Sequence, residues 1–250
     1  EKLHQGPKVT TKVKHGSPLQ HAIYGHFPHD PNCDACKRAR LTARAGYRNQ
    51  DPYYITGADK GYVVGIDIYG PFEPDLEGNT HSLIGVEVGR TDYTMIIPMK
   101  EKTSECILEA FKIMRKELVR LGKEKGVDVV RVHSDCDPSI VFPTEFSKYL
   151  LDEKIHQTDT GSYRPQNNAR TERRLRMVAE SVRAMMLKAT AGIDKCDTLW
   201  GLVQQQAAKC INRHTFSDGR CPCNLLTGKE YKWNKEDHVF GSGGVYYVPK

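Results

Sequence analysis

The chain has 250 residues, of which 38% are hydrophobic and 27% charged, so it can form one sizeable core with a small appendage. It contains no uncharged apolar run near the roughly 18 residues that a membrane-spanning helix needs and no signal-peptide pattern, so we expect no membrane partner. Lys and Arg number 37 against 31 Asp and Glu, and this net charge of +6 favours an anionic partner.

The basic residues are concentrated in two separate regions. Residues 1–60 contain ten Lys or Arg against five Asp or Glu, and residues 161–190 contain seven against two. This distribution is more typical of a nucleic-acid-binding surface than of general solubilisation. The alternative is a solvated helix face.

The N-terminal quarter divides into three parts. Residues 1–20 are polar and Lys-rich, which predicts a flexible basic arm, and residues 46–60 form a predicted linker. Between them, residues 21–45 are predicted to form a zinc-binding knuckle. The first residue is Glu1 rather than Met, which is typical of a chain excised from a longer product.

The predicted knuckle rests on a compact His/Cys cluster, HAIYGHFPHDPNCDAC, at residues 21–36. A C-x-x-C pair supplies two sulfur ligands from one turn, and two histidines complete the tetrahedral set that Zn²⁺ prefers. The predicted ligands of one Zn²⁺ ion are His21, His26, Cys33 and Cys36, with His29 as a substitute for either histidine. The alternative is a reduced surface C-x-x-C pair with unrelated histidines.

From residue 61 onward the hydrophobic pattern predicts alternating strands and helices. Strands are expected at 61–70, 81–89, 92–99, 126–133 and 154–158, and helices at about 104–121, 144–152, 168–189 and 198–212. The first three strands have short connections, which indicates an antiparallel meander. The fourth strand is expected to lie parallel to the first in an α/β layered domain. Residues from 238 are predicted to form one or two further strands.

Three carboxylates are candidates for a common site. Asp67 interrupts an otherwise apolar strand, where an unpaired carboxylate is costly to bury unless it binds a cation. Asp135 follows the fourth strand, and Glu172 lies near the start of the long helix. Their convergence would give an all-oxygen site suited to two Mg²⁺ or Mn²⁺ ions. Asp137 is an alternative to Asp135.

Three sequence motifs around these carboxylates indicate which kind of site they form. The segments VHSD at 132–135, YRPQNNARTERR at 163–174 and CPCNLLTGKEY at 221–231 resemble the retroviral and retrotransposon integrase family. The family's Asp-Asp-Glu order is matched, and 36 residues lie between Asp135 and Glu172, close to the family spacing. The family's Pro-Gln-x-Asn-Gly-x-x-Glu-Arg segment is matched at Pro165, Gln166, Asn168, Glu172 and Arg173. The chain departs from the family in having Asp135-Cys136-Asp137 where Asp-Asn-Gly is usual, and Ala169 in place of Gly.

The resemblance implies a ribonuclease-H-like three-layer core, with a mixed five-stranded sheet and flanking helices, plus the small N-terminal zinc unit. It implies a catalytic core at 61–215 and a C-terminal extension at 216–250 that begins a small β unit. The implied activity is that of a two-metal polynucleotidyl transferase that trims DNA 3′ ends and joins them to target DNA. The implied catalytic residues and Mg²⁺ or Mn²⁺ ligands are Asp67, Asp135 and Glu172.

The expected partner is double-stranded DNA, bound by a homo-oligomer in the nucleus or cytoplasm. The residues expected to contact DNA are Gln166, Asn167, Asn168, Arg170, Arg173 and Arg174. For the arginines, ion pairing with Glu180 or nearby acids is the alternative. Two other functions are compatible with the sequence, namely a catalytically silent nucleic-acid-binding remnant of such an element and a ribonuclease-H-type nuclease.

Overall fold

The computed structural model describes residues 18–39, 61–135, 137–141, 144–159, 169–189, 196–232 and 240. Several predicted features lie outside these residues, among them the linker at 46–60, the candidate DNA contacts Gln166, Asn167 and Asn168, and most of the predicted strands from 238. Within the described part, no helix is both long enough and apolar enough to cross a bilayer.

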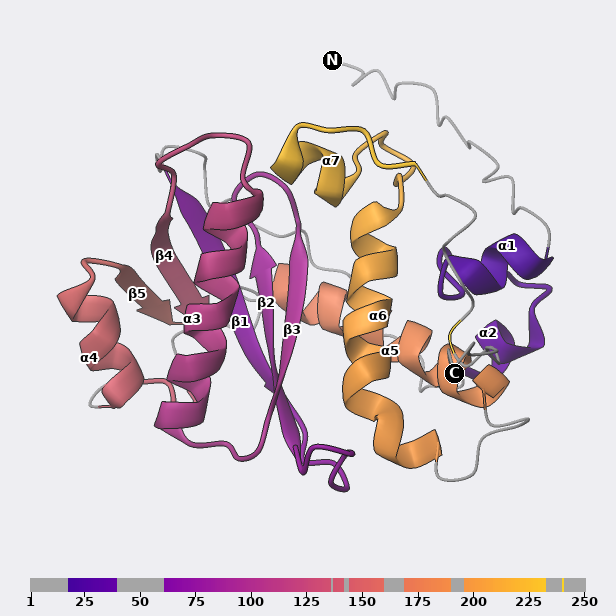
Figure 1. Ribbon diagram of the computed structural model, residues 1–250, viewed down its shortest axis with the longest axis horizontal. Coiled ribbons are helices and arrows are strands. Elements are labelled where there is room, and N and C mark those ends of the chain that lie inside the picture. Colours follow the sequence, from indigo (N-terminus) through magenta and orange to yellow (C-terminus); the bar gives the residue numbers. More distant parts are fainter. Residues whose placement is uncertain are drawn as a thin grey trace, which may run out of the picture.

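Five strands form one mixed sheet in the order β3-β2-β1-β4-β5 (Figure 1). The strands β1, β2 and β3 pair in antiparallel fashion, whereas β4 and β5 run parallel to β1. Their apolar, β-branched stretches favour a sheet covered on both faces. The predicted meander and the parallel fourth strand are thereby confirmed. The strand bounds are Tyr62–Tyr69, His81–Glu87, Thr94–Met99, Val129–Ser134 and His156–Asp159 for β1 to β5.

Helices cover both faces of the sheet and complete three layers. On one face lie α3 (Ser104–Leu121) and α4 (Glu145–Asp152), and on the other lie α5 (Ala169–Ala189) and α6 (Trp200–Arg213), which follows a short 3₁₀ turn at Cys196–Leu199. Side chains at helical spacing on α3 fill the first core, namely Ile107, Phe111, Met114 and Leu118. The predicted ribonuclease-H-like layering is therefore present.

Side-chain caps determine where two of these helices begin. The Thr103 hydroxyl accepts a hydrogen bond from the backbone N–H of Cys106 at the start of α3. At the start of α4, Thr144 and Ser147 form a reciprocal capping box. Each cap satisfies backbone donors that the first helical turn leaves unpaired, which explains the agreement with the predicted boundaries.

The segment after α6 packs on the core. Residues 216–232, which the sequence placed in a C-terminal extension, include the short helix α7 (Pro222–Thr227). Leu226 of α7 is 1% exposed and belongs to the core on the α3 face, and its carbonyl accepts from the N–H of Lys123 at 2.9 Å. A six-residue helix that begins at proline has too little periodicity to be recognised in the sequence.

The turn between β2 and β3 is organised by a buried carboxylate. Glu87 is fully buried and accepts hydrogen bonds from the backbone N–H groups of Gly89, Arg90 and Thr91 at 2.9, 3.0 and 2.7 Å. The Thr91 hydroxyl donates to the same carboxylate at 2.8 Å. Because the groups that donate to Glu87 all lie in the β2–β3 turn, these hydrogen bonds fix the backbone just before Asp92, the residue after Thr91.

Replacing Glu87 with Gln is expected to lower the free energy of unfolding by about 2–4 kcal/mol, because an amide cannot accept from all of these donors. Urea denaturation at neutral pH measures this loss. The matched control is Glu117→Gln, which removes an exposed ion pair to Arg120 on α3 and is expected to cost less than about 1 kcal/mol. Equal losses in the two variants would contradict this assignment for Glu87.

Candidate active site and metal centre

The register of two parallel strands brings Asp67 and Asp135 to the same edge of the sheet. Gly65 of β1 lies beside His133 of β4. Asp67 follows Gly65 by two residues, and Asp135 follows His133 by two residues. Residues two apart on a strand share a face, so both carboxylates lie on the face covered by α5. The predicted pairing of these two segments at the carboxyl ends of the parallel strands is therefore present.

The charge of Glu172 affects the ionisation of Asp67. Burial, followed by the charges of Asp135 and Glu172, raises the pKa of Asp67 to about 6, although a hydrogen bond from the Ile68 N–H at 2.8 Å opposes this rise. Glu172 lies in the first turn of α5 and is exposed. Asp67 is therefore the carboxylate whose ionisation the other two candidates disfavour.

Asp137 has a different set of contacts from Asp135. It forms an ion pair with Lys102 and accepts from the backbone N–H of Ser139 at 3.0 Å. Although burial acts in the opposite direction, these partners lower the pKa of Asp137, whereas burial and the charge of Asp137 raise that of Asp135. Asp135 is therefore the better candidate for a cation ligand, because Asp137 already has a cationic partner.

The donor set at this edge fits a hard divalent cation. Asp67, Asp135 and Glu172 offer only carboxylate oxygens, which are the ligands that Mg²⁺ and Mn²⁺ prefer. A bound cation would favour the charged form of Asp67, which burial and the charges of Asp135 and Glu172 disfavour. Lys102, which pairs with Asp137, had no signal in the sequence because it lies far from the carboxylates along the chain.

The His/Cys cluster is assembled as the sequence predicted. The candidate ligand atoms of His21, His26, Cys33 and Cys36 all lie within 4.8 Å of one another. The Nε2 atom of His21 is 3.1 Å from the Cys36 sulfur, and Nδ1 of His26 is 3.3 Å from the Cys33 sulfur. His29 is not part of this group.

Two nitrogens and two sulfurs around a common centre fit tetrahedral Zn²⁺. Burial and the charges of His21 and Lys188 lower the pKa of His26 to about 4, so this ring is neutral and able to ligate at pH 7. Burial raises the pKa of the Cys36 thiol to about 12. Because a metal binds the thiolate, loading of zinc would release a proton from Cys36.

The zinc unit, which includes α1 (Pro18–Ile23) and α2 (Asp34–Ala39), packs beside the C-terminal half of α5 (Figure 1). The contact is close at Gly25, whose carbonyl accepts from the Ser181 hydroxyl. A Cβ atom at Gly25 would lie 2.5 Å from Cε of Met185 and 2.9 Å from the sulfur of Cys210. The unit is therefore seated directly on the helices of the core.

Replacing Gly25 with Ala is expected to weaken this seating and to lower the free energy of unfolding by more than about 2 kcal/mol. Gly25 has a φ of +66°, and its new methyl group would also overlap Met185. The matched control is Gly78→Ala, where φ is +80° but no atom lies within 4 Å of the added Cβ, so only backbone strain of about 1 kcal/mol applies. Thermal unfolding of the zinc-loaded variants measures both, and equal losses would contradict the predicted overlap.

The three arginines predicted to contact DNA have different environments. Arg174 is 9% exposed, pairs with Asp92 at 3.4 Å and lies over the ring of Phe216 at 4.5 Å. Arg170 donates to the carbonyl of Val88, and Arg173 is exposed. For Arg174 the structure favours the ion-pair alternative, with Asp92 as the partner rather than Glu180. No sequence pattern indicated Asp92 as the partner, because it lies 82 positions before Arg174 along the chain.

No protein-family model matches the chain. Over 188 residues it is 26% identical to the Retrovirus-related Pol polyprotein from transposon TNT 1-94 of Nicotiana tabacum, an alignment that covers 74% of this chain and 13% of that protein. The chain therefore spans about one eighth of the length of this curated relative.

The chain is similar to two solved structures, of which the first is the more similar in fold. A chain of the simian T-cell lymphotropic virus intasome in complex with PP2A regulatory subunit B56 gamma is 13% identical, with a TM-score of 0.52 over 82% of this chain and 66% of that chain. The HTLV-2 integrase catalytic core domain in complex with magnesium is 12% identical, with a TM-score of 0.47 over 68% and 99% of the two chains. The five-stranded sheet order, the intasome similarity and the distant relationship to a Pol polyprotein confirm the predicted integrase-type ribonuclease-H-like fold.

Proposed function

We propose that this chain is a polynucleotidyl transferase of the integrase kind, which trims the 3′ ends of a mobile element's DNA and joins them to target DNA. The observation that supports the proposal is the parallel pairing of β1 with β4, which brings Asp67 and Asp135 to one edge of the sheet, together with the effect of the Glu172 charge on the pKa of Asp67. The fold and the distant similarity to a Pol polyprotein are consistent with it.

In this proposal Asp67, Asp135 and Glu172 would hold two Mg²⁺ or Mn²⁺ ions. The bound ions would supply a nucleophile of lowered pKa, either water or a DNA 3′-hydroxyl, and would stabilise the leaving oxygen. Asp67 lies on β1, the central strand of the sheet, with β4 and its neighbouring Asp135 on one side. Glu172 would close the site from the helix layer.

The zinc unit has a structural role in this proposal. His21, His26, Cys33 and Cys36 would hold one Zn²⁺ ion, which supplies folding free energy to a short segment with little apolar core of its own. In this proposal the zinc unit, predicted at 21–45, also takes in the start of α1 at Pro18, and the catalytic core predicted at 61–215 would be extended to include α7.

Double-stranded DNA is the proposed substrate, held by an assembly of several copies because two DNA ends must be joined together. The excess of basic residues supports phosphate contacts that are largely independent of sequence and sensitive to salt. Arg173 is exposed on α5 beside Glu172, where it can meet a phosphate. Gln166, Asn167 and Asn168 stay predicted contacts.

The proposal is tested with labelled duplexes that carry the ends of the parent element. Incubation with Mg²⁺ or Mn²⁺ is expected to yield trimmed and joined products, and EDTA is expected to prevent both. Duplex binding without metal-dependent nicking would instead identify a silent remnant. Selective cleavage of the RNA strand of a hybrid would identify a nuclease of the ribonuclease H type. Either result would overturn the transferase assignment.

A further inference from the structure

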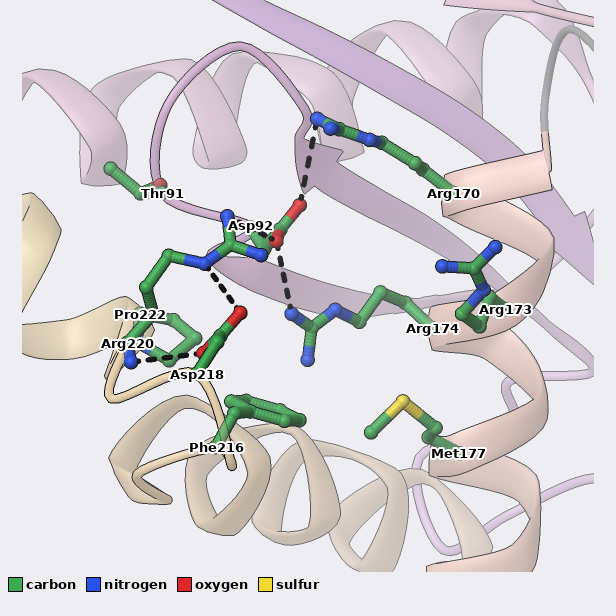
Figure 2. A pocket seen from close by; sticks show the side chains of 10 residues that line it. All are labelled: Thr91, Asp92, Arg170, Arg173, Arg174, Met177, Phe216, Asp218, Arg220 and Pro222. Atoms are coloured by element: carbon green, nitrogen blue, oxygen red, sulfur yellow. Dashed lines mark hydrogen bonds and ion pairs between the residues drawn. The ribbon is translucent and has the colours of Figure 1, made fainter. Parts of the chain in front are cut away.

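A second candidate site lies on α5, apart from the carboxylates. A cavity of about 300 Å³ is enclosed by the first turns of α5, the β2–β3 turn and the segment that joins α6 to α7 (Figure 2). On α5, Glu172 lies two residues from both Arg170 and Arg174, so at 3.6 residues per turn it is about 160° around the helix from each of them. Arg173 also lines the cavity and is about 100° from Glu172, so the cavity lies mainly on the part of α5 turned away from Glu172, with Arg173 between the two sites.

The cavity has an excess of positive charge. Among the residues that the structure describes, four guanidinium groups and two carboxylates line it, namely Arg170, Arg173, Arg174, Arg220, Asp92 and Asp218. Figure 2 shows that Arg170 and Arg174 reach from α5 towards Asp92, while Arg220 approaches from the opposite segment. Four positive groups and two negative groups leave a formal charge of +2.

The carboxylate of Asp92 makes long contacts with three arginines. Asp92 lies 3.4 Å from Arg174, 3.6 Å from Arg220 and 4.0 Å from Arg170, whereas the Arg220–Asp218 pair is closer, at 2.8 Å. Charge-assisted N–H···O hydrogen bonds measure about 2.7–2.9 Å, so the three contacts to Asp92 are longer than such bonds. The contact between Asp92 and Arg174 is therefore longer than a charge-assisted hydrogen bond.

Within the described part of the chain, the guanidinium group of Arg174 has one unsatisfied hydrogen-bond donor. Its side chain is nine-tenths buried over the Phe216 ring, and its Nη1 atom has no hydrogen-bond partner among the residues that the structure describes. Buried guanidinium N–H groups nearly always have acceptors, because an unsatisfied donor loses the hydrogen bonds of water without replacement. Since Arg174 lines the cavity, an acceptor within the cavity would satisfy this donor.

We propose that this arginine pocket, defined by Arg170, Arg173, Arg174 and Arg220, binds a phosphate oxyanion. A phosphate offers more acceptor oxygens than a carboxylate and can accept from several planar guanidinium groups at once. The volume also admits a group larger than a single phosphate. The phosphate can come from a free compound or from a DNA backbone. Only the second source rests on the proposed transferase function.

The test is isothermal titration of the zinc-loaded chain with pyrophosphate, without Mg²⁺ or Mn²⁺. The diagnostic variant is Arg220→Gln, because Arg220 is 51% exposed at the rim and its replacement leaves the core intact. Binding by the unmodified chain is expected to be about tenfold tighter than by this variant, the loss of one charge-assisted hydrogen bond. The matched control, Arg120→Gln, removes one positive charge from the exposed face of α3 and is expected to bind as the unmodified chain does.

Absence of pyrophosphate binding at millimolar concentrations would overturn the proposal, and so would equal binding by the Arg220→Gln variant. Competition with a fluorescent duplex in EDTA then distinguishes the sources. Displacement of the duplex by pyrophosphate from the unmodified chain, but not from the variant, supports a backbone phosphate. Pyrophosphate binding that leaves the duplex bound supports a free phosphate compound. Failure of strand joining would leave the pyrophosphate result unchanged, so the two proposals fail separately.

Discussion

Replacing Asp67 with Asn is expected to reduce metal-dependent DNA strand joining by about 10³-fold or more, while duplex binding persists. The variant would lose one of the carboxylates proposed to hold the metal ions, and with it the activation of the nucleophile and the stabilisation of the leaving oxygen that these ions would supply. The amide oxygen can still accept from the Ile68 N–H, so the local backbone is preserved. Joining is measured on labelled duplexes under single-turnover conditions, and binding is measured by fluorescence anisotropy in EDTA.

Two further measurements make this prediction specific. Without metal, the Asp67→Asn variant is expected to be at least as stable as the unmodified chain, because it removes a carboxylate whose charged form burial and Asp135 disfavour. Asp135→Asn and Glu172→Gln should lose joining to a similar degree. Asp137→Asn should retain most of it, since Asp137 is held by Lys102. Joining that survives in all three triad variants would remove these residues from the mechanism.

Replacing Cys36 with Ser is expected to abolish stoichiometric zinc binding and to release the zinc unit from α5 and α6. Structural Zn²⁺ in small folded units contributes about 10–16 kcal/mol of apparent binding free energy, which two six-residue helices cannot replace. Elemental analysis should find one zinc per unmodified chain and a ratio near zero in the variant. Hydrogen exchange should accelerate in α1 and α2, and proteases should gain access to the segment.

Cys223→Ser is the matched control, because this half-buried cysteine of α7 lies outside the His/Cys group. It should keep its zinc and its exchange protection in α1 and α2. A zinc content near zero in the unmodified chain would contradict the metal centre itself. Full zinc content in the Cys36→Ser variant would instead show that another ligand completes the site.

Much of the architecture is encoded locally and could be predicted for that reason. The sheet strands have apolar runs bounded by turns, and Thr103 and Thr144 mark helix starts through their own side chains. The charge of Asp67 within an apolar strand indicated a cation site before any partner was visible. The His/Cys cluster spans so few residues that its spacing alone predicted the metal group.

What could not be predicted depends on contacts between distant segments. The Asp92–Arg174 pair, the Lys102–Asp137 pair and the contact of Gly25 with Met185 each join residues that share no periodic pattern. Nothing in the spacing of the arginines on α5 distinguishes the buried Arg174 from the exposed Arg173, because the difference arises from Phe216 and Asp92. The arginine pocket therefore became visible only in three dimensions.

Helix α5 carries Glu172 near one end and receives the zinc unit at Ser181 and Met185. Thirteen residues separate Glu172 from Met185, which is about 20 Å of rigid helix. A change of about 5° in the orientation of α5 at Met185 would move Glu172 by almost 2 Å over this length. Metal ligation tolerates only about 0.2 Å of error. The position of Glu172 therefore depends partly on how firmly the zinc unit packs against the C-terminal half of α5.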